Sequence, residues 1–157
     1  MSQIKGPGIF LAQFCQDDAP FNSLQNICQW SADLGYKAVQ IPTWDKRLFD
    51  LELAHKSETY CDEIKGIVTD AGMSISELST HLQGQLVAVN PAYDQQFDAF
   101  APDEVKNNSK ARTQWAIEQV TMAAKVSQTL GLNAHASFSG ALLWHTAYPW
   151  PQRPPGL

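Results

Sequence analysis

The chain has 157 residues, 44% of them apolar, and a formal net charge of −5. This length allows one domain with a sizeable core. An acidic chain without clusters of Lys and Arg is a poor nucleic-acid binder, because contact with the phosphate backbone needs a basic surface. No apolar run approaches the roughly 20 residues of a membrane span, and the N-terminus lacks the basic and apolar regions of a signal peptide. We therefore expect neither a nucleic-acid nor a membrane partner.

The three cysteines, Cys15, Cys28 and Cys61, are widely spaced and form no C-x-x-C pair. An odd number of such cysteines is typical of reduced thiols and indicates a cytoplasmic protein. Cys28 and Cys61 fall on the core faces of predicted helices. The role of Cys15, just past a predicted strand, stays open.

The first part of the chain begins with an apolar run at 8–14 that predicts a strand. Asn22, followed by Gln25 three residues later, resembles a capping box at a helix start. Gly35 fits the stop of that helix. The second strand is predicted at 36–41.

The middle of the chain repeats this order. One helical turn is expected near Leu51, and Ser57 is expected to cap a longer helix with a clean amphipathic stripe. Gly72 ends that helix, and the third strand is predicted at 73–79.

The remaining elements follow a long insertion at 80–108, which carries a short helix near 93–100 and has a length typical of functional loops. Ser109 begins the next helix. Gly131 ends it, and the fourth strand is predicted at 132–138.

A helix that ends in glycine and leads directly into a strand occurs three times, at Gly35, Gly72 and Gly131. Strands that alternate with helices through short turns predict βαβ units and a parallel sheet. The predicted fold class is α/β, with residues 1–157 as a single domain of about four strands. In such sheets the ligand lies at the carboxyl ends of the strands.

Polar residues stand at equivalent points of three predicted strands. Gln13, Gln40 and Glu77 each lie five residues after the glycine that leads their strand. A polar layer in the mouth of a barrel explains this pattern, because the strands of a doubly wound sheet are more uniformly apolar. Chance is the alternative.

The stretch 79–85 concentrates hydrogen-bonding groups where the third strand is predicted to open into a polar loop. His81 is placed to act as a general acid or as a hydrogen-bond donor to a sugar oxygen, beside Gln83 and Gln85. Gly84 allows close approach of the backbone to a ligand. The alternative is a histidine that only holds the loop in place.

Aromatic residues follow two of the predicted strands. Trp44, Trp144 and Trp150 are candidates for stacking on a sugar ring, with loop packing as the alternative. A zinc site of His81, His135 and His145 has no support in their spacing.

Two carboxylates near strand ends, Glu77 and Asp45, are candidates for metal contact. Glu77 fits a buried structural carboxylate equally well.

Five blocks of sequence carry a family resemblance. They are ISELSTHLQGQLVAV (75–89), NPAYD (90–94), FDAFAP (97–102), FSGAL (138–142) and YPWPQRP (148–154). In these blocks the chain resembles the sugar phosphate isomerase/epimerase family of the xylose-isomerase-like TIM barrel superfamily. The resemblance implies a (β/α)8 barrel and a divalent metal such as Mn, Mg, Co or Zn. It also implies isomerisation or epimerisation of a sugar or sugar phosphate through an enediol.

The resemblance covers only the first half of such a barrel, because the family members run to about 250 residues or more. It implies that the metal ligands come from later strands, so no metal ligand is assigned here and the isolated chain is expected to be inactive. His81 and Gln83 carry over as substrate contacts, together with Trp44 and Trp150, and His81 is also the predicted catalytic residue.

Four parallel strands curled as in a barrel leave two open edges and an uncovered inner face. The chain is therefore expected to form a homodimer, to pair with a complementary half-barrel, or to be an inactive truncated product. A non-catalytic sugar-binding half-barrel is the alternative function. An endonuclease-like protein that acts on abasic DNA is disfavoured by the acidic charge.

Overall fold

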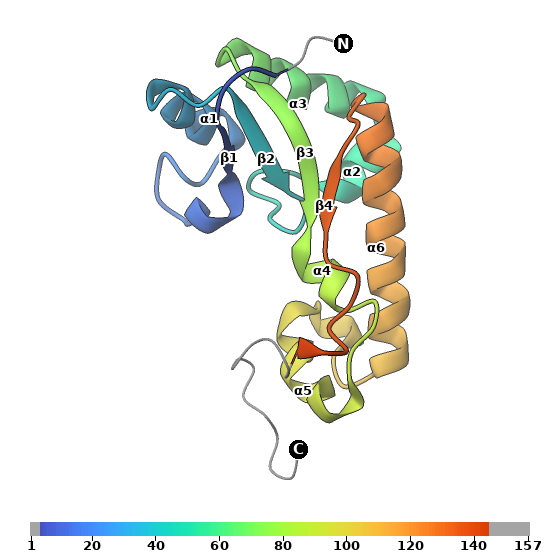
Figure 1. The fold of residues 1–157 in the computed structure, drawn as a ribbon. Coiled ribbons are helices and arrows are strands. Elements are labelled where there is room, and N and C mark those ends of the chain that lie inside the picture. Colours follow the sequence, from blue (N-terminus) through green and yellow to red (C-terminus); the bar gives the residue numbers. More distant parts are fainter. Residues whose placement is uncertain (1–3, 145–157) are drawn as a thin grey trace. The chain divides into compact units, whose positions relative to one another are not determined.

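A computed structural model of the protein describes residues 4–144. Strands and helices alternate along these residues (Figure 1). The strands are β1 (Gly8–Phe10), β2 (Ala38–Pro42), β3 (Ser74–Thr80) and β4 (His135–Ser137). The helices are α1 (Leu24–Asp33), α2 (Leu51–Lys56), α3 (Glu58–Asp70), α4 (His81–Gln85), α5 (Asp94–Phe97) and α6 (Ser109–Thr129). Single 3-10 turns occupy Leu11–Phe14, Pro91–Tyr93, Asp98–Phe100 and Asp103–Val105.

Within the described residues, the four strands form one open parallel sheet in the order β1-β2-β3-β4. The register places Phe10 opposite Gln40, and Gln40 opposite Glu77. The predicted α/β class and parallel sheet are confirmed. Whether the sheet belongs to a closed barrel remains a proposal.

The three glycine turns are confirmed. Gly35, Gly72 and Gly131 have φ angles of +93°, +72° and +75°. This left-handed region favours glycine because a Cβ atom is strained there. Each turn leads from a helix into the next strand.

The first strand is shorter than the predicted 8–14. It ends at Phe10, and Leu11–Phe14 forms a 3-10 turn. The turn carries Phe14 onto Trp30 of α1, with 5.0 Å between the ring centroids. This aromatic packing overrides the strand pattern of the apolar run.

Other boundaries shift by smaller amounts. The helix predicted to begin at Asn22 is capped instead by Ser23, whose hydroxyl accepts a hydrogen bond from the Asn26 amide at 3.3 Å. The fourth strand begins only at His135, because the Leu132 amide still donates to the Ser127 carbonyl at 2.9 Å to close the end of α6. The predicted cap at Ser57 is confirmed, with a hydrogen bond of 3.1 Å from the Tyr60 amide.

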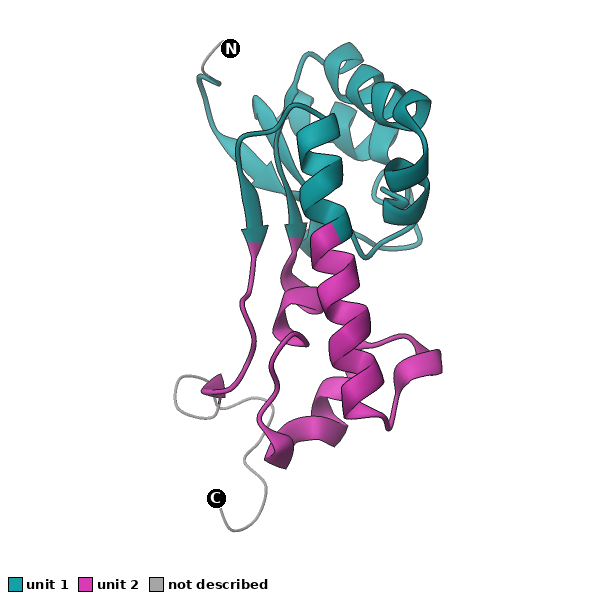
Figure 2. Ribbon diagram, turned by 90° about the vertical axis from the view of Figure 1, so that its right-hand side faces the viewer, with its two compact units in different colours: residues 1–79, 122–136 teal, residues 80–121, 137–157 magenta. Residues whose placement is uncertain are grey.

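The chain divides into two compact units, shown in Figure 2. Unit 1 comprises residues 1–79 and 122–136, and unit 2 comprises residues 80–121 and 137–157. Helix α6 contributes to both units. Each unit has its own apolar cluster.

In unit 1, buried side chains from the strands meet buried side chains from the helices. Val39 and Ile41 of β2 share a cluster with Ile27 of α1, Ile64 of α3 and Ala123 of α6. The helices of this unit lie on one side of its strands (Figure 2). Cys28 and Cys61 are fully buried in the same cluster, as predicted.

Unit 2 is built around a buried guanidinium. Arg112 is 1% exposed, and its Nη1 donates to Asp98 Oδ1 and to the Asp94 carbonyl at 2.7 Å each. Its Nη2 donates to the Asp94 carboxylate. The second oxygen of Asp98 accepts the Asn107 amide at 2.9 Å. These bonds tie the predicted short helix near 93–100, which is present as helical turns, to the start of α6.

Candidate functional site

The stretch 79–85 is the end of β3 and the short helix α4 rather than an open polar loop. Gln83, Gly84 and Gln85 are buried. Within α4, only His81 and Leu82 are partly exposed. The predicted cluster of exposed hydrogen-bonding groups is therefore reduced to one imidazole at the carboxyl end of β3.

Gly84 serves the protein's own packing. A Cβ at this position would lie 2.3 Å from the Phe138 carbonyl oxygen and 2.5 Å from Ser137 Oγ, both closer than real Cβ contacts. The Gly84 carbonyl also accepts the Gly140 amide at 2.8 Å. The predicted close approach is thus made by the segment after β4, and the proposed approach to a ligand is not what requires this glycine.

His81 keeps partial exposure and an apolar neighbour. Its ring centroid lies 5.0 Å from that of Phe138, with the two planes 39° apart. Burial lowers the pKa of His81 below its ordinary value, so the imidazole is neutral at neutral pH. A neutral imidazole can donate a hydrogen bond from one nitrogen and accept one, or a proton, at the other.

Gln83 is 2% exposed, so its side chain packs inside unit 2 and does not reach solvent. The buried Oε1 atom of the neighbouring Gln85 has no partner among the described residues. Sugar contact by Gln83 stays a prediction that would need local rearrangement of α4.

Trp44 lies in unit 1, directly after β2. Its ring makes an edge contact with Phe10 of β1, with 6.3 Å between centroids and 73° between planes. The side chain is partly exposed. The stacking of Trp44 on a sugar ring stays a prediction.

A polar group that sequence reasoning missed lies beside Trp44. Arg47 binds Asp45 through two hydrogen bonds, of 2.9 Å from Nε and 2.6 Å from Nη2, and Asp17 through Nη1 at 2.5 Å. These contacts link the segment after β1 to the segment after β2. The only sequence signal for them is the Asp-x-Arg spacing after a predicted strand.

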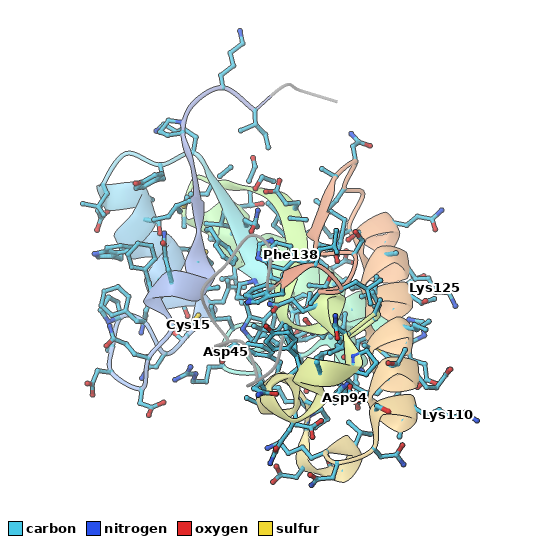
Figure 3. All side chains as sticks on the ribbon, turned by 60° about the horizontal axis from the view of Figure 1, so that its bottom comes forward. Cys15, Asp45, Asp94, Lys110, Lys125 and Phe138 are labelled. Carbon is cyan, nitrogen blue, oxygen red and sulfur yellow. The ribbon has the colours of Figure 1, made fainter. Side chains whose placement is uncertain are left out.

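Cys15 belongs to this group. Its thiol donates to the Leu11 carbonyl at 3.4 Å, and its side chain lies near that of Asp45 (Figure 3). Burial, with Asp45 adding to it, raises the pKa of the Cys15 thiol to about 11. The guanidinium of Arg47 lowers the pKa of Asp45. Cys15 is therefore a protonated thiol rather than a nucleophile.

The predicted polar layer is formed in part. Gln40 Nε2 donates to Glu77 Oε1 at 2.5 Å, between the neighbouring strands β2 and β3. Gln13 does not join them, because the 3-10 turn leaves it exposed and the register brings Phe10 to that row. Gln40 and Glu77 thus form the polar pair of the sheet, and Glu77 has the structural partner that was one of its two predicted roles.

The remaining candidates do not gather into a site. Trp144 packs at right angles on Phe97, with 5.6 Å between centroids, which supports loop packing. Trp150 and His145 lie outside the described residues. His135 lies in unit 1 with its Nδ1 3.1 Å from Ser127 Oγ.

The described residues do not fit the divalent metal that the resemblance implies. Within residues 4–144, no group of three or more His, Cys, Asp or Glu side chains is arranged to hold an ion. The two candidate acids are already engaged, Glu77 with Gln40 and Asp45 with Arg47.

Fold and site together define an α/β protein with an open parallel sheet and a neutral histidine at the carboxyl end of β3. No family model matches the chain, and no curated protein is significantly similar to it. In the described part of the chain, no helix combines the length and apolarity needed to cross a bilayer.

Proposed function

We propose that this chain forms the substrate side of a sugar or sugar phosphate isomerase or epimerase, with β1 to β4 as the first half of a TIM barrel. The observation that carries the proposal is the neutral, partly exposed imidazole of His81 at the carboxyl end of β3. Ligands of parallel α/β sheets bind at this end of the strands. The alternation of helices and parallel strands supports the barrel.

His81 is proposed to contact the substrate oxygens or to transfer a proton. An enediol reaction removes a proton from the carbon beside a carbonyl and returns a proton to the neighbouring carbon. An imidazole that is neutral at working pH can accept such a proton or hydrogen-bond the developing oxygen charge. The sugar contacts predicted for Trp44 and Trp150 stay predictions, and the one predicted for Gln83 would require its buried side chain to become exposed.

The proposal assigns no metal ligand, because the described residues do not fit the implied ion. A divalent metal, when bound, would polarise the substrate carbonyl.

A second candidate function is sugar binding without catalysis. It is favoured by the side-chain partners of the two candidate acids. Glu77 is hydrogen-bonded to Gln40, and Asp45 is hydrogen-bonded to Arg47. An abasic-site endonuclease is disfavoured by the net charge of −5.

The proposal includes a partner for the sheet. Among the described strands, β1 and β4 each have a sheet neighbour on one side only, and an open edge invites pairing. A second copy or a complementary half-barrel fits these edges. Three free thiols support a cytoplasmic location.

The experiment is a binding and turnover assay on a panel of aldoses, ketoses and their phosphates, with and without Mn²⁺, Mg²⁺, Co²⁺ or Zn²⁺. Calorimetry measures binding, and chromatography of the sugars measures conversion. His81→Ala is expected to weaken binding or turnover roughly two- to tenfold, the effect of one lost hydrogen bond to a substrate.

His55→Ala is the matched control, because His55 is exposed on α2. It is expected to leave binding and turnover unchanged. Conversion of any sugar by the wild-type chain would exclude the second candidate, whereas the first candidate expects the isolated chain to bind a sugar without converting it. No binding of any sugar to the wild-type chain would overturn both.

A further inference from the structure

Phe138 is a large apolar side chain that the fold leaves open to solvent. It follows β4 directly and is 44% exposed (labelled in Figure 3). Its ring nevertheless contacts the imidazole of His81, with 5.0 Å between ring centroids. Sequence reasoning used Phe138 only as part of a family block and gave it no role.

The backbone around Phe138 is held by several hydrogen bonds within unit 2. Ser137 Oγ donates to the Phe138 carbonyl at 2.8 Å, and Thr80 Oγ1 donates to Ser137 Oγ at 2.9 Å. The Gly140 amide donates to the Gly84 carbonyl at 2.8 Å. The segment that carries the ring is thus fixed against the end of β3 and α4.

Two glycines allow the backbone around Phe138 to pack this closely. A Cβ on Gly84 would lie 2.3 Å from the Phe138 carbonyl oxygen. Gly140 has a φ angle of +104°, and a Cβ there would lie 2.8 Å from Ala88 Cβ. These contacts hold the backbone of the segment that carries the ring close to α4 and Ala88.

We propose that Phe138 is a positioning residue for His81, fixing the plane of the imidazole and excluding water from one of its faces. The inference rests on the proposed role of His81 in substrate contact. An aromatic ring packed against an imidazole restricts its rotation, and the apolar surface disfavours the charged form. The exposed part of the Phe138 ring stays open beside the histidine.

The lowered pKa of His81 agrees with this geometry. Burial is the cause of the lowered pKa, in line with the apolar ring that packs on the imidazole. Removal of the neighbouring ring should therefore reduce the burial of the imidazole and raise its pKa.

The test is an NMR titration of the imidazole C–H signals of His81 in the 157-residue chain, assigned with His81→Gln. Phe138→Ala is expected to shift the titration midpoint upward and to remove the ring-current displacement of the His81 signals. Phe138→Leu should keep part of the low midpoint but lose the ring-current displacement. Phe138→Tyr should retain both the low titration midpoint and the ring-current displacement.

Leu142→Ala is the matched control, since it removes another exposed apolar side chain from the same segment. It is expected to leave the His81 signals unchanged. Gly84→Ala, if it folds, should disturb them as Phe138→Ala does. Identical His81 titrations in the wild type and in Phe138→Ala would overturn the inference.

A sugar-binding measurement separates this inference from the proposed function. If the wild type binds a sugar, Phe138→Ala should weaken binding at least fivefold and Phe138→Tyr should recover it. If the wild type binds none, the proposed function fails, while the NMR titration still decides whether Phe138 positions His81.

Discussion

The Cβ that Gly84 lacks would lie 2.3 Å from the carbonyl oxygen of Phe138. A backbone atom cannot give way as the end of a flexible side chain can, so the segment after β4 would have to shift. Gly84→Ala is therefore expected to lower the free energy of unfolding by about 1–3 kcal/mol. Urea denaturation followed by circular dichroism measures this change.

Gly66→Ala is the matched control for this prediction. Gly66 lies inside α3, and its added Cβ meets no atom within 4 Å. Alanine is the better helix former by about 0.5–1 kcal/mol, so this variant should be more stable than the wild type. Equal effects of the two substitutions would show that the contact with Phe138 is not what requires Gly84.

Loss of the buried guanidinium of Arg112 should lower the free energy of unfolding more than Gly84→Ala does. Arg112→Ala leaves the buried Asp98 and the partly exposed Asp94 without their cation in unit 2. Loss of one partner from a buried ion pair costs about 3–5 kcal/mol. Denaturant unfolding should show a loss of this size, while Lys106→Ala, which removes the exposed pair with Asp103, should leave the midpoint unchanged.

The pH dependence of stability should carry a contribution from His81. Its pKa is lowered in the folded state, so below the ordinary value of 6.5 the unfolded chain binds the proton more readily. Stability is therefore lost as the pH falls through this range. His81→Gln should show a smaller loss between about pH 7.5 and about pH 5.5, measured by urea denaturation; an equal loss in the wild type and the variant would contradict this prediction.

Cys15 should react slowly with alkylating agents. With a pKa of about 11 against an ordinary 9.0, its thiolate fraction near neutral pH is about 100-fold below that of a free thiol. Mass spectrometry after iodoacetamide treatment measures the rate against the urea-unfolded chain. Asp45→Asn removes a group that raises this pKa, so it should speed the reaction; an unchanged rate would show that burial alone protects the thiol.

The local signals in the sequence predicted much of the fold. Glycine just past a helix needs no tertiary contact to favour a left-handed turn, so Gly35, Gly72 and Gly131 placed three helix ends correctly. The side chain of Ser57 bonds an amide three residues away, and that cap was also predicted. These features depend on neighbours along the chain, which a sequence displays directly.

Contacts between distant segments could not be predicted in this way. The first strand stops early because Phe14 packs on Trp30, and Gln13 leaves the polar row as a result. The pairing of Gln40 with Glu77 was suggested by spacing, but their hydrogen bond depends on the register between β2 and β3.

For the candidate site, the sequence by itself determined which residue types stand after each strand, and it singled out His81. Only the tertiary structure decided how that histidine is surrounded. The backbone of the segment after β4 packs closely against Gly84 of α4, and the ring of Phe138 contacts the imidazole of His81. Residues 81 and 138 are far apart in the chain, and only the folded packing of β3, α4 and β4 brings their rings together.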